Sequence, residues 1–329
     1  MATEQVDTLY PTRRMRPSKI SIVGAGAVGT ALAYACVIKG VARDVVLYDI
    51  AKEKVEAEAL DIAHGIQFTP VGSIVGSDDV EAMRDSDMVV ITAGPKQKPG
   101  QSRLDLAEAT ASMLEKMIPE VLRVAPDALI LMVTNPVDVA THIALKISGL
   151  ERNRIFGSGT VLDTSRLRYL VSKVTGVAVR NIHAYVTGEH GDSEVALWSC
   201  AEIGNVPVQR WGATVDGKPF DDEVRRDIAH QVVRSAYHII DGKGATNYAI
   251  GLAAANIINA ALRDEERVLT ISTLLEGWEG ISGVCMAAPT IVGIEGAGRV
   301  LNPPITLDER EALTKSALAL REVARGLGY

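Results

Sequence analysis

The sequence of 329 residues has few cysteines and no excess of positive charge, and both features exclude classes of protein. Its three cysteines are odd in number and widely spaced, which excludes a disulfide framework and a paired-cysteine zinc site; they are Cys36, Cys200 and Cys285. We therefore expect buried thiols, no bound metal and a reducing, cytoplasmic location. A net charge of −7 at pH 7 argues against a nucleic-acid partner, because phosphate binding requires a basic surface.

Long uninterrupted apolar runs are also missing. The stretch 248–262 is among the longest, but Asn256 and Asn259 interrupt it, and it falls short of the roughly 18 residues that a transmembrane helix needs. Near the N-terminus, several arginines are followed by Pro17 where a signal peptide would have its apolar segment. The sequence thus predicts no membrane partner and an exposed N-terminal arm at residues 1–18.

What is present in the first half is a regular alternation of strand and helix patterns. Four short apolar runs are typical of strands buried on both faces; they lie at 19–23, 45–48, 88–93 and 128–134. A further short strand is expected at 73–76. Helical patterns separate the strands; they lie at 27–39, 52–64 and 104–124. This order predicts a parallel sheet covered by helices on both faces.

The second half of the chain has a different pattern. Shorter alternating runs are mixed with two long helical segments; the runs lie at 182–187, 267–275 and 281–286. The last helix is predicted to begin with a capping box, formed by Thr306 and Glu309. Because a domain has about 150 residues, we expect this half to form a second, α+β domain.

A glycine-rich pattern follows the first apolar run at once: Gly24-Ala25-Gly26-Ala27-Val28-Gly29. In a turn from strand to helix, such glycines let a pyrophosphate approach the backbone, and the helix N-terminus attracts its charge. A turn that binds nothing is the alternative for this pattern alone. Asp49 favours a binding site over such a turn. It ends the second predicted strand about 20 to 25 residues beyond the first glycine, where a carboxylate binds ribose hydroxyls.

The same carboxylate favours NAD over NADP as the cofactor. It would repel a 2′-phosphate, and no arginine follows it directly, although Lys52 and Lys54 leave NADP open as the alternative. We predict an α/β fold in which a Rossmann-type doubly wound parallel sheet, residues 19–157, binds NAD. An α+β substrate and catalytic domain is predicted to follow at residues 158–329.

Hydride transfer to a carbonyl needs a proton donor, a cation beside the oxygen and a group that binds the substrate. His190 is a candidate donor, since it lies between glycines in Gly188-Glu189-His190-Gly191-Asp192-Ser193, although a lone histidine is more often structural. Asp163 and Arg166 are further candidates, but their i,i+3 spacing is also that of an ion pair within a helix.

Two polar residues at predicted loops complete the candidates. Arg103 follows residues 94–100, which begin and end with glycine, and this segment is either a closing lid or a solvated surface loop. Asn135 precedes Pro136 at the end of the fourth apolar run, where ligands of parallel sheets bind, or it forms a simple turn.

Taken in order, these motifs resemble the lactate and malate dehydrogenase family over residues 19–329. The resemblance rests on the glycine-rich turn, on Thr134-Asn135-Pro136, on Gly157-Ser158-Gly159-Thr160 through Asp163 and Arg166, and on the segment 188–193. It implies that His190, charged and oriented by Asp163, donates a proton while NADH transfers a hydride to C2 of a 2-oxo acid.

The resemblance also implies roles for the other candidates. Arg166 would bind the substrate carboxylate, Arg103 would polarise the carbonyl as a loop closes, and Asn135 and Thr246 would contact the substrate. The implied NAD-binding residues are Gly24, Gly26, Ala27, Val28, Gly29, Asp49, Thr92, Ala93, Gly94 and Asn135.

Substrate and regulation are further implications of the resemblance. Residues 97–103 are similar to the lactate-specific members, whereas malate-specific members carry arginine in place of Gln97, so interconversion of pyruvate and (S)-lactate, as in lactate fermentation, is implied. Malate oxidation and an inactive NAD-sensing protein are the alternatives. Arg168 and His183 match positions that bind fructose 1,6-bisphosphate in many bacterial members, and members are usually tetramers. An allosteric activator and a homotetramer are therefore implied.

Overall fold

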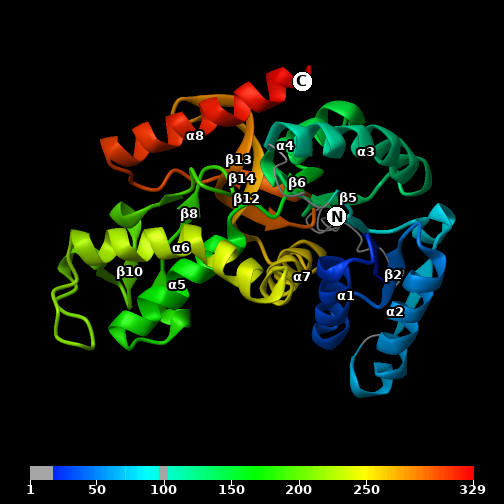
Figure 1. Cartoon of the computed structure of the whole chain (residues 1–329), viewed down its shortest axis with the longest axis horizontal. Helices are drawn as coiled ribbons and strands as arrows, with labels where there is room; N and C mark the ends of the chain where they lie inside the picture. Colours follow the sequence, from blue (N-terminus) through cyan, green and yellow to red (C-terminus); the bar gives the residue numbers. More distant parts are fainter. Residues whose placement is uncertain (1–17, 71, 96–102) are drawn as a thin grey trace, which may run out of the picture.

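The computed structural model describes residues 18–70, 72–95 and 103–329, without the side chains of residues 103 and 104. In its first half, strands and helices alternate (Figure 1); they are β1 (Lys19–Val23), α1 (Ala27–Lys39), β2 (Asp44–Tyr48), α2 (Lys52–His64), β3 (Ser73–Ser77), β4 (Met88–Ile91), α3 (Arg103–Val124), β5 (Leu129–Met132), α4 (Val137–Ser148) and β6 (Ile155–Gly157). The six strands are parallel, in the order β3-β2-β1-β4-β5-β6. The predicted doubly wound parallel sheet is confirmed.

The second half is α+β, as predicted. Its main elements are α5 (Val161–Thr175), β7 (Ile182–His183), β8 (Val186–Thr187), β9 (Val195–Ala196), β10 (Glu202–Ile203), β11 (Val206–Pro207), α6 (Asp222–Lys243), α7 (Tyr248–Leu262), β12 (Arg267–Trp278), β13 (Ile281–Gly293), β14 (Gly296–Val300) and α8 (Leu307–Gly326). The capping box of Thr306 and Glu309 is present at the start of α8. The apolar run 182–187 is divided, because β7 and β8 belong to two different small sheets.

The long strands β12, β13 and β14 extend the parallel sheet of the first half. Ser272 of β12 pairs antiparallel with Gly157 of β6, which joins the strands into one nine-stranded sheet. In Figure 1 these strands lie between the helices of the two halves. This single sheet therefore crosses the domain boundary expected between residues 157 and 158. Because the sheet is continuous, the ends of β1, β5 and β6 belong to the same folded unit as α5 and β8.

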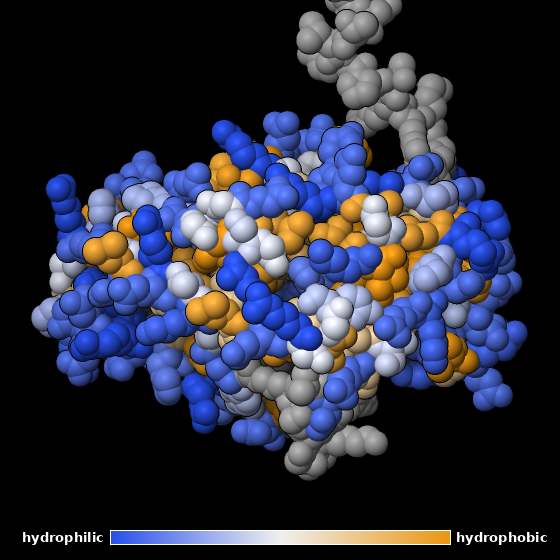
Figure 2. Space-filling model, turned by 90° about the horizontal axis from the view of Figure 1, so that it is seen from above, coloured by the Kyte–Doolittle hydropathy of each residue, from blue (hydrophilic) through white to orange (hydrophobic). Residues whose placement is uncertain are grey.

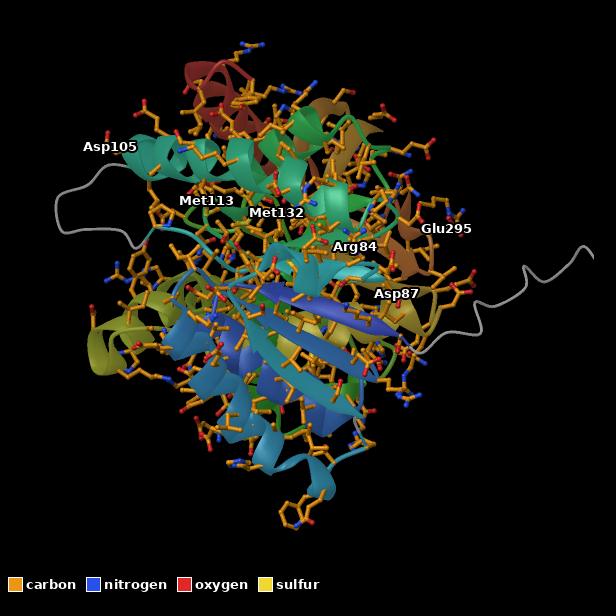
Figure 3. All side chains as sticks on the ribbon, turned by 90° about the vertical axis from the view of Figure 1, so that its right-hand side faces the viewer. Arg84, Asp87, Asp105, Met113, Met132 and Glu295 are labelled. Atoms are coloured by element: carbon orange, nitrogen blue, oxygen red, sulfur yellow. The ribbon has the colours of Figure 1, made fainter. Side chains whose placement is uncertain are left out.

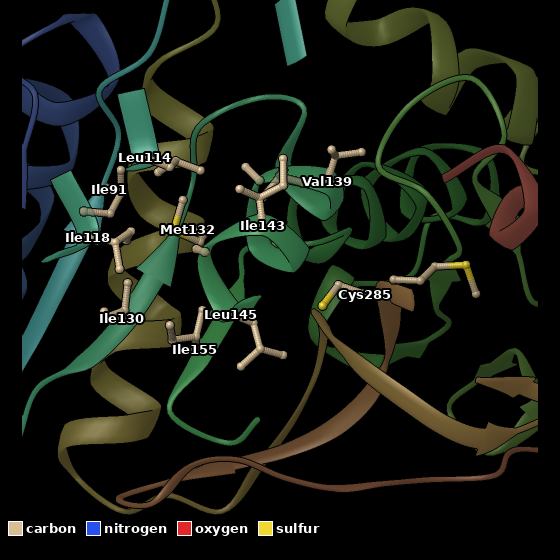
Figure 4. Close-up of a cluster of buried hydrophobic side chains, with 14 of the residues drawn as sticks. Ile91, Leu114, Ile118, Ile130, Met132, Val139, Ile143, Leu145, Ile155 and Cys285 are labelled. Carbon is tan, nitrogen blue, oxygen red and sulfur yellow. The ribbon is translucent and has the colours of Figure 1, made fainter. Parts of the chain in front are cut away.

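Apolar side chains fill both faces of this sheet, which explains the continuous apolar runs in the sequence. On one face, Ile91, Ile130 and Met132 pack with Leu114 and Ile118 of α3 (Figure 4). Figure 3 shows α3 above the strands and α1 and α2 below them, with Met113 and Met132 labelled in the layer between α3 and the sheet. A second buried cluster lies on the opposite face, where α1 and α7 cover it.

The surface over α8 and α3 is mostly hydrophilic, with apolar side chains grouped between the polar ones (Figure 2). Across the described ranges, none of the helices combines the length and the hydropathy that a membrane span requires. A third buried cluster packs α5 and α6 against the small sheets of the second half.

Candidate active site

Two glycines allow β1 to pass directly into α1. Gly24 has φ of +105°, and a Cβ there would lie 2.7 Å from the Ala93 nitrogen; a Cβ at Gly29 would lie 1.8 Å from the Gly24 oxygen. Larger residues are therefore excluded at both positions. At Gly26, by contrast, apart from the glycine and its two chain neighbours, no atom of the described residues lies within 4 Å of the Cβ position. The turn thus leaves its backbone open to a ligand at Gly26.

Asp49 is held against this turn by backbone amides. Its Oδ2 accepts a hydrogen bond from the Ala25 N–H at 2.7 Å, and its Oδ1 accepts one from the Ala51 N–H at 3.0 Å. Each carboxylate oxygen keeps a second lone pair, so Asp49 can still accept hydrogen bonds from hydroxyl groups. The carboxylate is thereby fixed beside the glycine-rich turn, at the end of β2.

The start of α1 and the residues that follow β4 lie beside the glycine-rich turn and complete the candidate dinucleotide site. In the described structure no side chain caps α1, so the N–H groups of Ala27, Val28 and Gly29 are left for an anion. Thr92 donates a hydrogen bond to the Gly24 oxygen at 3.1 Å, and the Ala93 N–H donates to the Val23 oxygen at 2.8 Å. Gly94 follows them at the same edge. These residues fit a dinucleotide, with pyrophosphate at the helix and ribose at Asp49.

A cavity of about 640 Å³ begins at Tyr48, the residue before Asp49, and extends to α3, where Met113 and Met117 line it. This volume is within the range of small-molecule sites, roughly 300 to 1,000 Å³. The cavity lies at the carboxyl ends of β2 and β3, the edge at which parallel sheets bind ligands. It offers room for the adenosine end of a dinucleotide.

A second group of polar side chains gathers around Asp163 in the first turn of α5. The Asp163 Oδ2 lies 2.6 Å from His190 Nδ1, and its Oδ1 lies 2.5 Å from Arg166 Nη1. The Asp163 side chain is 2% exposed, and that of His190 is 25% exposed. The ion pair expected within the helix is present, and the same buried carboxylate also binds the imidazole.

These contacts decide the charge of His190. Burial alone would lower the pKa of the ring, but the charge of Asp163 and the hydrogen bond to it outweigh burial and raise the pKa to about 9. Burial would likewise raise the pKa of Asp163, but His190 and Arg166 keep it below its ordinary value. At neutral pH the cluster therefore holds an imidazolium, a carboxylate and a guanidinium. Since Nδ1 faces Asp163, the proton on Nε2 is the one available for transfer.

The ion pair with Asp163 positions the guanidinium of Arg166 but leaves most of its N–H donors available. Its side chain is 14% exposed, and within the described ranges only Asp163 accepts a hydrogen bond from it. Four of its five N–H donors are left for a planar anion such as a substrate carboxylate. The arrangement can therefore bind a carboxylate and protonate an oxygen next to it.

The loop 188–194 that carries His190 is held by β13 and α8. Gly188 exchanges two backbone hydrogen bonds with Ala287, at 3.0 and 3.1 Å. The Glu189 N–H donates to the Ser316 Oγ at 2.8 Å, and Ser193 shares a hydrogen bond with the same hydroxyl at 2.9 Å. The imidazole is thus aimed at Asp163 by contacts from two other elements.

One buried acid, Asp138, and one half-buried acid, Glu194, were missed from the sequence at this loop. Asp138 of α4 accepts a hydrogen bond from the His190 backbone N–H at 2.7 Å, and Glu194 has a carboxylate oxygen within 4.8 Å of the Asp163 and His190 ligand atoms. In the sequence, Asp138 could have been found as an acid in the apolar stretch after Pro136, and Glu194 as an acid that closely follows His190. Such a cluster has metal-ligand spacing, but the guanidinium and the imidazolium oppose a cation, and we keep the expectation of no metal.

Glu194→Gln is expected to change the pH dependence of the carbonyl reduction that the resemblance implies, but not the rate of that reaction at pH 7. Burial and the charge of Asp163 raise the pKa of Glu194 to about 8, so the side chain is neutral at pH 7 and glutamine resembles it. Above pH 8 the wild-type carboxylate ionises and helps to keep His190 protonated. The variant lacks this charge, so its rate should fall at lower pH than that of the wild type, which a pH–rate profile measures. Equal alkaline limbs in the two proteins would contradict this prediction.

The remaining predicted residues are only partly placed. Asn135 is exposed at the end of β5, and Thr246 is half-buried between α6 and α7. Gln97 lies outside the described residues, and so does the side chain of Arg103 at the start of α3. Arg168 donates a hydrogen bond to the Ala184 oxygen at 3.0 Å, and its guanidinium lies over the Tyr185 ring. His183 is exposed.

Comparison with known families matches nearly the whole chain. The model described as the lactate/malate dehydrogenase NAD binding domain covers residues 18–157. The model described as the lactate/malate dehydrogenase alpha/beta C-terminal domain covers residues 160–325. The glycine-rich turn thus falls in the first match and the His190 cluster in the second.

Individual proteins are similar over the same length. The chain is 53% identical to the L-lactate dehydrogenase of Bifidobacterium animalis subsp. lactis, over 96% of this chain and 98% of that protein. It is 44% identical to L-lactate dehydrogenase 1 of Clostridium acetobutylicum, over 93% and 97%. Among solved structures, the minor L-lactate dehydrogenase of Enterococcus mundtii superposes with a TM-score of 0.90 at 36% identity, over 94% of this chain and 98% of that chain. A lactate dehydrogenase from a deep-sea metagenome of the Medee basin also gives 0.90, at 37% identity, over 96% and 100%.

Proposed function

This chain belongs to the lactate/malate dehydrogenase family, and from this membership and the geometry of its site we infer that it catalyses the L-lactate dehydrogenase reaction, the NAD-dependent interconversion of pyruvate and (S)-lactate. The observation that carries the inference is the pairing of His190 and Arg166 with one buried carboxylate, Asp163. Bound NADH supplies the hydride that reduces C2 of pyruvate.

Each side chain of the cluster has its own role in the rest of the reaction. Arg166 binds the pyruvate carboxylate through its free N–H donors and so holds the carbonyl near His190. The His190 Nε2 donates its proton to the carbonyl oxygen, and Asp163 stabilises the charged ring before the transfer and orients it afterwards. Arg103 polarises the carbonyl, and Asn135 and Thr246 contact the substrate. Lactate oxidation uses the same groups in reverse, with neutral His190 as the base.

Gln97 is expected to select pyruvate over oxaloacetate. A second substrate carboxylate beside neutral glutamine would lack a partner, and an unpaired charge in a closed site costs about 3 to 5 kcal/mol. NADH oxidation should therefore be at least about a hundredfold more efficient with pyruvate, as kcat/KM, than with oxaloacetate. Gln97→Arg should shift this ratio toward oxaloacetate.

Gln101→Arg is the matched control for that experiment, since it places the same charge in the same segment. A wild-type preference for oxaloacetate would instead select malate as the substrate. No turnover with any 2-oxo acid, in protein that binds NADH, would select the inactive NAD-sensing protein.

Regulation and assembly form the finer part of the proposal. Arg168 bonds to the backbone oxygen of Ala184, the residue after His183, and cationic side chains suit a sugar phosphate, so we propose that fructose 1,6-bisphosphate binds Arg168 and His183 and activates the enzyme. Activation at low pyruvate, lost in Arg168→Gln and kept in Arg152→Gln, would support the assignment; equal activation in both variants would contradict it. We also propose a homotetramer, which light scattering tests.

We propose that the chain divides into an arm at 1–18, an NAD-binding domain at 19–157 and a catalytic domain at 158–329. The free thiols of Cys36, Cys200 and Cys285 support a location in the reducing cytoplasm.

A further inference from the structure

Two methionines of α3 line the cavity of about 640 Å³ that offers room for the adenosine end of NAD. Met113 and Met117 are four residues apart, so they lie on the same face of the helix. Figure 3 labels Met113 in the layer between α3 and the strands. Both side chains are half-buried. The wall of the cavity therefore contains two thioethers, about one helical turn apart.

These two methionines are more exposed than the others. The remaining methionines of the described ranges are at most 1% exposed; they are Met83, Met88, Met132 and Met286. Met83 also lines the cavity, but its side chain is almost completely buried. A small reagent dissolved in water can therefore reach Met113 and Met117 before it reaches these four.

The three cysteines are poor competitors for an oxidant at neutral pH, because peroxides react with the thiolate form of cysteine. Burial raises the pKa of Cys36 to about 12 and that of Cys200 to about 11, and it raises the pKa of Cys285 as well. Very little thiolate is therefore present at pH 7. A thioether has no proton to lose, so its oxidation needs no prior ionisation.

We propose that hydrogen peroxide oxidises Met113 and Met117 to sulfoxides and that this modification weakens the binding of NADH. The inference rests on the proposed function, because it requires that NADH binds in this cavity. In each reaction the methionine sulfur attacks one peroxide oxygen, and an S–O bond forms as the O–O bond breaks. The departing hydroxide takes the proton of the transferred oxygen and leaves as water. Sulfur is oxidised and the peroxide is reduced, so no further reactant is needed.

Oxidation changes how this wall contacts a base. A thioether is apolar and polarisable, and it packs well against a flat aromatic ring. A sulfoxide is polar, and its oxygen adds volume to the side chain. The face of a base has no hydrogen-bond donor, so a base bound against the sulfoxide would take water from this oxygen without replacing the hydrogen bond. The oxidised wall should therefore bind adenosine more weakly.

The sites of oxidation are tested by peptide mass spectrometry on the full chain after treatment with hydrogen peroxide. Met113 and Met117 should each gain one oxygen before Met88, Met132 and Met286 do. Saturating NAD+ should slow the oxidation of both residues, because bound adenosine covers them. Sulfoxides that form first at the buried methionines, or rates at Met113 and Met117 that NAD+ does not change, would overturn the proposal.

The effect on the cofactor is tested by a fluorescence titration with NADH. Oxidation of the wild type should raise the dissociation constant at least about tenfold, and methionine sulfoxide reductases should lower it again. Met113→Leu/Met117→Leu keeps two apolar side chains of similar size, so its dissociation constant should be the same before and after peroxide. Met88→Leu/Met132→Leu, the same change at two buried methionines, should lose affinity on treatment as the wild type does.

Two results of the titration would overturn this inference alone. They are an unchanged dissociation constant in oxidised wild type, and an equal loss of affinity in Met113→Leu/Met117→Leu. If the protein bound no NADH before any oxidation, the proposed cofactor would be wrong, and this inference with it. Because binding is measured before and after treatment, failure of the inference is distinguishable from failure of the proposed function.

Discussion

Replacing His190 with glutamine is expected to lower kcat for pyruvate reduction by about 10²- to 10⁴-fold, the range that a positioned acid contributes. Glutamine keeps hydrogen-bonding atoms near Asp163 but has no proton that it can release at neutral pH. The glycine-rich turn and Asp49 lie on β1, α1 and β2, so NADH binding should be retained. Steady-state NADH oxidation and a fluorescence titration with NADH measure the two properties.

His230→Gln is the matched control, because it is the same change at an exposed histidine of α6. Its kcat should equal that of the wild type. A loss of less than tenfold in His190→Gln, in protein that still binds NADH, would show that another group protonates the carbonyl.

Replacing Asp163 with asparagine is expected to lower pyruvate reduction at pH 7.5 on the order of 10- to 1000-fold. The carboxylate raises the pKa of His190 to about 9 against the effect of burial, so without it the pKa should fall below its ordinary value of about 6.5. Most of the imidazole would then be neutral at pH 7.5 and unable to donate. Lowering the pH should restore part of the rate, whereas the wild-type rate should stay level until the pH approaches 9.

The control for this variant is Asp222→Asn on α6. Asp222 also forms an i,i+3 ion pair, with Arg225, but its side chain is 82% exposed and lies outside the site. Its pH–rate profile should match that of the wild type. If Asp163→Asn kept the wild-type alkaline limb, the carboxylate would not be what charges His190.

Local patterns predicted the elements of the parallel sheet well. The run 19–23 is β1 to the residue, because the buried apolar stretch ends at a glycine that must turn. The run 88–93 was predicted two residues too long, since Thr92 and Ala93 leave the strand and bond back to the Val23 oxygen. Residue type and period carry this information within the segment itself.

These local patterns could not predict contacts between segments that are distant in the sequence. The pairing of Ser272 with Gly157 joins strands more than a hundred residues apart, and nothing in either segment specifies it. Asp138 was overlooked for the same reason, since its partner is the backbone N–H of His190. His190, Asp163 and Arg166 were candidates from their residue types and context, but only the family resemblance decided between a catalytic role and a structural one, because the spacing of Asp163 and Arg166 also fits a simple ion pair.

The nine-stranded sheet has a practical consequence for dissecting this protein. A fragment that stops at residue 157 would leave β6 as a bare edge, with the backbone groups that now face β12 unpaired and the apolar surface under α7 and β13 uncovered. Exposed strand edges recruit other chains. Such a fragment should therefore precipitate or self-associate when expressed alone, even though it contains every residue of the nucleotide-binding turn.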